Sequence, residues 1–507
     1  MPCDVEGAEP AQGRIDALDP TGGAENFKSS GNLWNRASDL RPWIPAILGL
    51  AAAAIMLAAF AVLFGHREAR PAFRAEGDRL MDGNETVFIR GAMYFQPHAF
   101  HQYFWEELDL AIMREDFKAM RDQGFNAVGI QVNWASFMPS VDQNSSTRTL
   151  SDDNEQKLVE LLTEAERDGL YTILWFGISR IPEGVEAKPY EEYVDVGGVK
   201  HGPFSGYLLY NYPGIAEEDT FAWRCFVEFH ERIARITREF ERIIYDPLDW
   251  QHLNMNTWSW DDPLNLKAWR GFLQDQAEDL RYWNRRWGEQ NPAWEDVVFP
   301  VDSWVVDSIA RIETSHYHDL PVLPYTARKW NDFNQWHDLL YQKVAEEITS
   351  AIKRGNPRAL VGQRIDIWRY GYHREETWGV GSVDLYFAGD YPARREEAED
   401  ASSVVMRNLN APRTRAKDKK PVVFWETGIP VKQLYPEEEA EAREARRAGY
   451  LKSLDQACLD EGLAGWCWWV WRDYYLDENS KDWGLVAVDN QPKPAIAVMQ
   501  ELEGRAR

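Results

Sequence analysis

Cysteine is scarce in this sequence: four residues among 507, namely Cys3, Cys225, Cys458 and Cys467. None belongs to a CxxC pair or to a spacing typical of zinc ligands, so the sequence predicts neither a metal site nor a disulfide framework. Cys458 and Cys467 could pair in an oxidising compartment. We interpret them instead as small buried hydrophobic residues.

Several motifs of cofactor and catalytic chemistry are also absent. The chain contains no GxGxxG, P-loop, GxSxG or HExxH pattern, and no cofactor is predicted. Basic residues are outnumbered, with 56 Lys and Arg against 82 Asp and Glu, which gives a net charge of −26. Because phosphate binding needs a basic surface, nucleic acid is excluded as a partner. The charge itself is interpreted mainly as an aid to solubility.

Aromatic residues are abundant, by contrast, with 24 Trp, 21 Tyr and 22 Phe. Such residues can pack a core, and they can also form flat platforms for the C–H faces of sugar rings. The hydrophobic and charged fractions, 44% and 27%, are those of a folded protein. The aromatic content alone favours a carbohydrate ligand only slightly.

One long uncharged run, residues 42–65, is apolar on every face. About 20 helical residues cross a bilayer core, so this run predicts a transmembrane helix that contacts the lipid bilayer. The alternative is a cleaved signal peptide, but its charged leader is short, whereas residues 1–41 precede this run. Those residues predict a disordered tail, residues 66–84 a linker, and residues 85–507 the folded domain.

The orientation of this predicted helix is not decided by its flanking charges. Arginines follow the run as well as precede it, and long domains translocate largely regardless of local charge. We expect a single-pass membrane protein whose large C-terminal domain lies in the periplasm or outside the cell, where its predicted substrate is found.

After residue 85, short apolar runs alternate with amphipathic helices, a pattern typical of parallel α/β folds. Eight strands are predicted, at 87–95, 125–134, 170–178, 243–255, 359–368, 383–392, 421–430 and 463–474. Eight strand-then-helix units without a glycine-rich phosphate fingerprint favour a (β/α)8 TIM barrel over a doubly wound sheet.

Functional residues of such barrels gather at the carboxyl ends of the strands. Glu426 is the most informative of these, because it ends the apolar run "VVFW", where a buried charge is costly unless it is hydrogen-bonded or used. The Tyr391 hydroxyl could hydrogen-bond this carboxylate. The other candidates at strand ends are His98, Asn133, Trp134, Asn254, Met255, Asp366, Asp390, Trp469 and Trp471.

Several stretches resemble retaining glycoside hydrolases of the superclan that includes β-galactosidases and cellulases, in layout most like the family 42 β-galactosidases. They are "RGAMYFQP", "DFKAMRDQGFNAVGIQVNWASFMP", "WNRRWG", "KPVVFWETG" and "WGLVAVDNQPKPA". The resemblance spans about residues 87–497. It implies a glycosidase barrel, a carbohydrate substrate, and a fourth strand that ends in Asn-Glu, with the Glu as general acid.

By this resemblance Glu426 is the nucleophile and Asn254 contacts the sugar 2-hydroxyl. The acid position is occupied by Met255, which has no proton to donate. Asp366 and Asp390, at the ends of neighbouring strands, are the candidate replacements, and a gap of about 6.5–9.5 Å to Glu426 would suit an inverting mechanism. Asp261 and Asp262 could fold back or cap a helix.

Two functions remain open from the sequence. The first is a membrane-anchored glycoside hydrolase or transglycosylase, acting on a polysaccharide or oligosaccharide, with Glu426 as nucleophile and a displaced or missing acid. The alternative is a catalytically inactive barrel that binds glycan in an envelope or polysaccharide-export assembly. A purely structural scaffold remains only if no sugar binds.

Overall fold

A computed structural model describes residues 73–99, 103–176, 181–185, 193–194, 200–201, 213–247, 262–300, 328–364, 382–392, 394–406, 419–475 and 482–502. The chain divides into two units, residues 1–70 and 71–507, and all of the described residues belong to the second. The transmembrane segment predicted at 42–65 and the tail before it lie outside the described residues. No helix within the described ranges is long and apolar enough to span a bilayer.

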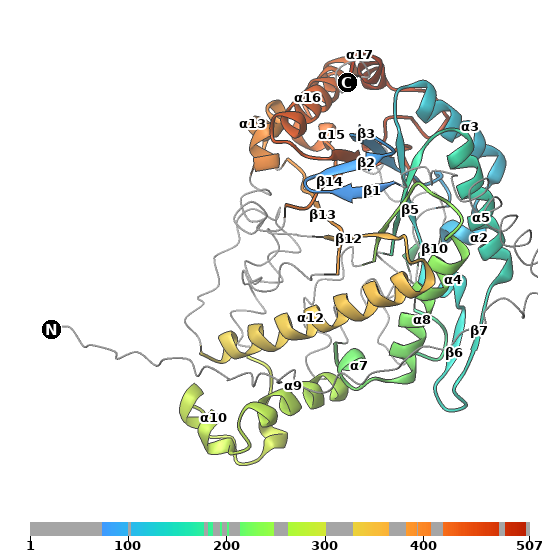
Figure 1. Cartoon of the computed structure of the whole chain (residues 1–507). Coiled ribbons are helices and arrows are strands. Elements are labelled where there is room, and N and C mark those ends of the chain that lie inside the picture. The colour runs from blue at the N-terminus through green and yellow to red at the C-terminus, as the bar shows by residue number, and fades with distance from the viewer. Residues whose placement is uncertain are drawn as a thin grey trace, which may run out of the picture. The chain divides into compact units, whose positions relative to one another are not determined.

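Eight parallel strands close into a barrel in the order β11-β12-β13-β14-β15-β4-β5-β8. Of these strands, Figure 1 labels β5, β12, β13 and β14. Along the chain they are β4 Ile89–Met93, β5 Ala127–Gln131, β8 Tyr171–Trp175, β11 Ile243–Asp246, β12 Leu360–Arg364, β13 Leu385–Ala388, β14 Val422–Thr427 and β15 Gly465–Trp468. Each lies within one of the eight predicted segments, so the predicted (β/α)8 barrel is confirmed.

Strand pairing determines which side chains fill the barrel. Gly129 of β5 pairs with Ile173 of β8, and a Cβ on Gly129 would lie only 2.7 Å from Cη2 of Trp425. The indole of Trp425, on β14, therefore crosses the interior towards Gly129. Side chains alternate along a strand, and paired residues of neighbouring parallel strands face the same side. The inward position of Gly129 therefore identifies which residues of the neighbouring strands face the interior.

Amphipathic helices surround the barrel. They include α3 Leu110–Asp122, α5 Asp152–Arg167, α8 Phe221–Ile236, α12 Arg328–Gly355 and α16 Ala440–Asp460. Side chains cap three of their N-termini: Asp109 accepts from the backbone of α3, Ser151 from that of α5 and Thr220 from that of α8. Gly124, just after α3, has φ +91°, a conformation that glycine adopts readily and that ends a helix.

Buried charges tie these helices to the outside of the barrel where β15 meets β4. Asp455 of α16 accepts hydrogen bonds from Arg90 of β4 at 2.7 Å and from the Trp466 indole of β15 at 2.9 Å. Asp116 of α3 likewise accepts from Arg472 at 2.7 Å and from the Tyr94 hydroxyl at 3.0 Å. Each carboxylate thus joins the strands on both sides of this seam to one helix.

Short strands and helices make up the rest of the described structure around the barrel. A three-stranded antiparallel sheet, β1 Arg74–Glu76, β2 Arg79–Asp82 and β3 Glu85–Val87, precedes the first barrel strand. Residues 74–76 and 79–82 of this sheet fall within the segment 66–84 that was predicted to be a linker. The remaining short elements are α2 Phe104–Glu107, α4 Trp134–Phe137, β6 Ser140–Asp142, β7 Thr147–Thr149, β9 Tyr193–Val194, β10 Lys200–His201, α7 Pro213–Glu217, α13 Arg395–Glu399, α15 Val431–Leu434, η4 Pro494–Ala497 and α17 Val498–Leu502.

The predicted helical insertion after the fourth barrel strand forms α9 Pro263–Gln276 and α10 Leu280–Trp287, followed by η2 Trp294–Asp296. Both helices pack near the N-terminal half of α12 (Figure 1). Aromatic rings hold them there, because Trp269 of α9 packs 5.7 Å from Trp336 of α12.

The described cysteines are buried thiols outside any disulfide: Cys225, Cys458 and Cys467. Burial raises the pKa of Cys458 and of Cys467 well above the ordinary thiol value. The interpretation of these two residues as small buried hydrophobic residues is confirmed.

A buried histidine predicts how stability depends on pH. His230 of α8 stacks on Phe176 at 4.5 Å, and its Nδ1 lies 2.8 Å from the Phe226 carbonyl oxygen. Burial lowers the pKa of His230 to about 4 from 6.5. Between pH 6.5 and pH 4 the unfolded chain therefore binds more protons at this histidine than the folded chain does. The free energy of unfolding falls by roughly 3 kcal/mol as the pH drops through this window.

We expect His230→Gln to flatten the fall in unfolding free energy between pH 6.5 and pH 4. Denaturant titrations across this range measure the effect. His98→Gln is the control, because His98 is exposed and its replacement should leave the slope unchanged. A wild-type slope in His230→Gln would contradict the assignment.

Candidate functional site at the carboxyl ends of the strands

Glu426 ends the apolar part of β14 and turns into the site rather than out towards solvent. Its φ is +60°, a left-handed conformation that costs a non-glycine residue about 1–2 kcal/mol. The pairing of β14 with β15 shifts register between Phe424 and Thr427. This irregularity leaves Trp425 in the barrel interior and directs the Glu426 carboxylate towards residues from β12 and from the segment after β13.

Arg364, the last residue of β12, forms an ion pair with Glu426. Its Nη1 donates to Oε2 at 2.5 Å, and the two side chains are 1% and 5% exposed. Removing both charges from water is expensive, so the pair persists only with close, well-aligned contacts. Sequence reasoning did not select Arg364, although a charged residue that ends the apolar run "ALVGQ" was a usable signal.

Tyr391 holds the other oxygen of the same carboxylate. Its hydroxyl donates to Oε1 at 3.0 Å, as the sequence suggested it could. Burial, and then the negative charge of Glu426, raise the pKa of Tyr391 well above its ordinary value, which keeps the phenol protonated as a donor. Both oxygens of Glu426 therefore accept a hydrogen bond from a different strand end.

Asp390 is buried beside Tyr391. Its Oδ1 accepts the backbone N–H of Tyr391 at 2.8 Å, so one oxygen shapes the turn that presents the phenol. The remaining predicted residues of the catalytic centre, Asp366, Asn254 and Met255, lie outside the described residues. Their predicted roles stay predictions.

The other predicted ligand-binding residues occupy several environments. Trp469 follows β15 and packs edge-on against Phe95 at 5.7 Å. His98 is exposed, and Asn133 is buried just before α4. Trp134 and Trp471 are each 1% exposed.

The two fully buried indoles serve as packing. Trp134 meets Phe226 of α8 edge-on at 5.1 Å, and Trp471 donates its indole N–H to Asp116 of α3 at 3.1 Å. Trp471 follows the end of β15 at Trp468, and its side chain is directed towards α3.

A second carboxylate at the strand ends was missed by the sequence reasoning. The described part of the fourth barrel strand, β11, ends at Asp246, far before the predicted end at residue 255. Asp246 pairs with Trp175 of β8, which pairs with Gln131 of β5. Asp246, Trp175 and Gln131 lie on the same face of the sheet as Ile173 and Gly129, so all three side chains face the barrel interior near the carboxyl ends of the strands. Asp246 is completely buried.

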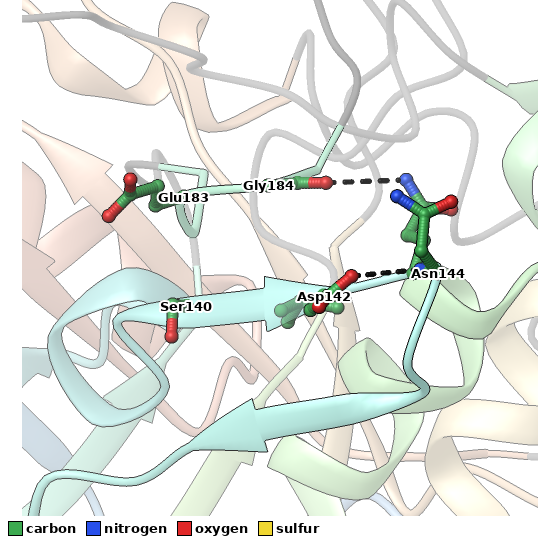
Figure 2. Close-up of a pocket in the computed structure, with 7 residues that line it drawn as sticks. Ser140, Asp142, Asn144, Glu183 and Gly184 are labelled. Atoms are coloured by element: carbon green, nitrogen blue, oxygen red, sulfur yellow. Dashed lines mark hydrogen bonds between the residues drawn. The ribbon is translucent and has the colours of Figure 1, made fainter.

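A polar pocket of about 570 Å³ lies on the loops that follow β5 and β8. Figure 2 shows Ser140 and Asp142 on β6, with Glu183 and Gly184 on the facing segment. The backbone N–H of Val141 donates to the Glu183 carbonyl at 2.8 Å, and Gln143 donates to the Gly184 carbonyl at 3.5 Å. The pocket is lined by carboxylate, amide and hydroxyl groups, which can hydrogen-bond polar ligands.

Within the described ranges, no group of three or more His, Cys, Asp or Glu side chains is arranged to hold a metal ion.

Comparison with known proteins shows the fold. No family model and no curated protein matches this sequence. Among solved structures, similar ones include the polyextremophilic β-galactosidase of Halorubrum lacusprofundi, at 15% identity and TM-score 0.55 over 82% of this chain and 57% of that one. The β-galactosidase of Rahnella sp. R3, at 14% identity and TM-score 0.55, matches 86% of this chain and 58% of that one.

The β-galactosidase of Bacillus circulans sp. alkalophilus is similar at 14% identity and TM-score 0.54, over 82% of this chain and 55% of that one. This chain thus spans between 55% and 58% of the length of these three proteins. At such identities the likeness establishes a shared barrel architecture with glycoside hydrolases.

The buried ion pair makes a prediction about stability. Arg364→Met leaves a buried carboxylate without its cation, and we expect a loss of about 3–5 kcal/mol in unfolding free energy. The double variant Arg364→Met/Glu426→Gln should recover most of that loss, because no buried charge is then left alone. Denaturant unfolding measures both variants.

The exposed pair between Lys118 and Asp122 supplies the control. Lys118→Met should cost less than about 1 kcal/mol, since water screens that pair. If Arg364→Met were as stable as Lys118→Met, the ion pair with Glu426 would be ruled out as a stabilising contact.

Proposed function

We propose that this protein is a retaining-type glycoside hydrolase or transglycosylase that acts on a polysaccharide or oligosaccharide, with Glu426 as the nucleophile. The observation that carries the proposal is the Glu426 carboxylate, turned into the carboxyl end of the barrel and held by Arg364 and Tyr391. The architecture shared with β-galactosidases supports the same conclusion.

The contacts of Glu426 suit a nucleophile better than a proton donor. Its two partners, a guanidinium and a phenol, both donate hydrogen bonds, and an ionised carboxylate accepts both. A protonated carboxyl would have to give up one of them. In the proposed first step a Glu426 oxygen bonds to the anomeric carbon while the glycosidic C–O bond breaks, and the departing oxygen takes a proton.

The proton needs a donor other than Met255. We propose Asp246, because it ends the same barrel strand that carries the acid in the resembling enzymes and faces the interior. Asp366 and Asp390 remain the alternatives, although one oxygen of Asp390 is already engaged by the Tyr391 backbone. Water then attacks the glycosyl–Glu426 ester, and the deprotonated acid accepts the proton.

The remaining site residues fit the handling of a glycan. Trp469 lies near the carboxyl end of β15, and Asn254 is proposed to contact the sugar 2-hydroxyl. The polar pocket between β6 and residues 183–184 can hydrogen-bond sugar hydroxyls on one side of the barrel opening (Figure 2).

We further propose that residues 42–65 anchor the protein in a membrane and that the barrel lies in the periplasm or outside the cell. The run is uncharged and long enough to cross a bilayer core. That location brings the barrel to an envelope or secreted glycan.

An inactive glycan-binding barrel in an envelope or polysaccharide-export assembly is the second candidate. Two observations favour it: Met255 stands at the usual acid position, and the Arg364 guanidinium offsets the charge that a nucleophile needs. The two functions differ in whether a covalent bond to Glu426 forms.

Covalent trapping tests the leading proposal. We expect 2-fluoroglycosyl fluorides to label Glu426, because their activated leaving group departs without an acid, and peptide mapping locates the label. Glu426→Gln should not be labelled, whereas Glu396→Gln, an exposed change on α13, should react as the wild type does. Glycan binding by calorimetry with no labelling by any sugar would replace the leading proposal with the binding function.

A leaving-group series tests Asp246. Asp246→Asn should slow the cleavage of alkyl glycosides by about 10²–10⁴-fold, and it should barely affect glycosyl fluorides, which need no proton. The values of kcat/KM on the two substrate classes measure this split, because kcat/KM reports the glycosylation step and not the later attack of water, in which the same residue accepts a proton. Asp390→Asn is the comparison variant, and a larger split there than in Asp246→Asn would move the acid role to Asp390.

A further inference from the structure

We infer that Trp483 is a positioning residue for this site, which acts on Glu426 through Tyr391. The inference rests on the proposed role of Glu426 and deepens it. Trp483 lies on the segment after the last barrel strand, 57 residues beyond Glu426 (483 minus 426). Its indole packs edge-on against the Tyr391 ring, at 5.1 Å and 76° between the ring planes.

The backbone around Trp483 is anchored independently of Tyr391. Asp482 accepts the Lys432 backbone N–H at 2.6 Å and a hydrogen bond from Arg447 of α16 at 3.1 Å. On the other side, the Gly484 N–H donates to Asp473 at 2.7 Å. Three hydrogen bonds therefore tie the residues on either side of Trp483 to α15, to α16 and to the segment after β15.

The Trp483 carbonyl adds a fourth anchor, because it accepts the indole N–H of Trp468 on β15 at 3.1 Å. With its main chain held on both sides, the Trp483 side chain has a defined direction. Residues 482–484 therefore hold the Trp483 indole in one position against its neighbours.

The Trp483 indole contacts both partners of one hydrogen bond of Glu426: the residue that donates it and the chain next to the residue that accepts it. One edge contacts Tyr391, whose hydroxyl donates to Oε1 of Glu426 at 3.0 Å. The six-membered ring also covers Gly428, where an added Cβ would lie 3.4 Å from Cε3 of Trp483. Gly428 follows Glu426 by two residues, so the indole restrains both the donor and the turn that carries the acceptor.

A single hydrogen bond from the hydroxyl does not fix the orientation of a tyrosine ring, so the side chains that pack against the ring determine where the hydroxyl points. Without the indole, the Tyr391 ring can tilt and its hydroxyl can leave Oε1. Small displacements of a reacting group cost large factors in rate, because the near-attack geometry is lost. The indole should therefore matter to the rate of attack by Glu426 and far less to glycan binding.

The test is a double-variant comparison on the full chain. We expect Trp483→Leu to slow the labelling of Glu426 by 2-fluoroglycosyl fluoride by about tenfold, with little change in the sugar concentration at half-saturation. In a Tyr391→Phe background the same replacement should have less than about a twofold effect, because the hydroxyl it positions is already absent. Trp336→Leu, a change in the aromatic cluster of α12, is the matched control and should label at the wild-type rate.

A second measurement does not depend on turnover. Nitration by tetranitromethane requires phenolate, which burial and Glu426 disfavour at Tyr391. We expect Trp483→Leu to accelerate nitration of the Tyr391 peptide, and Trp336→Leu to leave it unchanged. An unchanged nitration rate in Trp483→Leu, or an equal labelling loss with and without the Tyr391 hydroxyl, overturns the inference.

The two proposals fail in different ways. Absence of any label on wild-type Glu426 would defeat the proposed function, while the nitration comparison would still decide whether Trp483 positions Tyr391. Wild-type labelling that Trp483→Leu leaves intact would keep the function and overturn the positioning role.

Discussion

The arrangement at the carboxyl end of the barrel depends on one interaction, the buried contact between the Glu426 carboxylate and the Arg364 guanidinium. A lone carboxylate in this position would be far too costly to bury. The compensating hydrogen bonds come from Arg364 on β12 and from Tyr391 in the segment after β13. These contacts therefore exist only when β12, β13 and β14 are assembled in this order, and residues from outside β14 hold the Glu426 carboxylate in place.

The same contact bears on both proposed functions. A guanidinium orients a carboxylate and also offsets its charge, which favours a well-placed nucleophile of modest strength. Asp246 is a further carboxylate that faces the barrel interior. It ends β11, the strand next to the β12 strand that carries Arg364. Glu426, Asp390 and Asp246 are thus buried carboxylates at the carboxyl ends of the described strands, and the proposed glycosyl transfer would draw its acid from this set because Met255 holds the expected acid position.

The segment after the last barrel strand extends this network. Asp482, Trp483 and Gly484 connect α16, the Tyr391 ring and Asp473, so a stretch distant in sequence contributes to the direction of one phenol. Two other buried carboxylates perform a comparable task on the outside of the barrel: Asp455 joins α16 to β4 and β15, and Asp116 joins α3 to the residues that follow these strands. Charged groups therefore hold this fold together at its seam as well as at its opening.

The sequence by itself determined the eight strands, their order along the chain, and the place of Glu426 near the end of one of them, because apolar runs separated by amphipathic helices and a charge at a strand end are local patterns. Only the tertiary structure decided that Arg364 is the partner of Glu426, that the described part of β11 ends at Asp246, and that the Trp471 indole turns towards Asp116. The physical reason is that periodicity records which residues are apolar, whereas the end of a strand and the partner of a buried charge depend on elements brought together from distant parts of the chain.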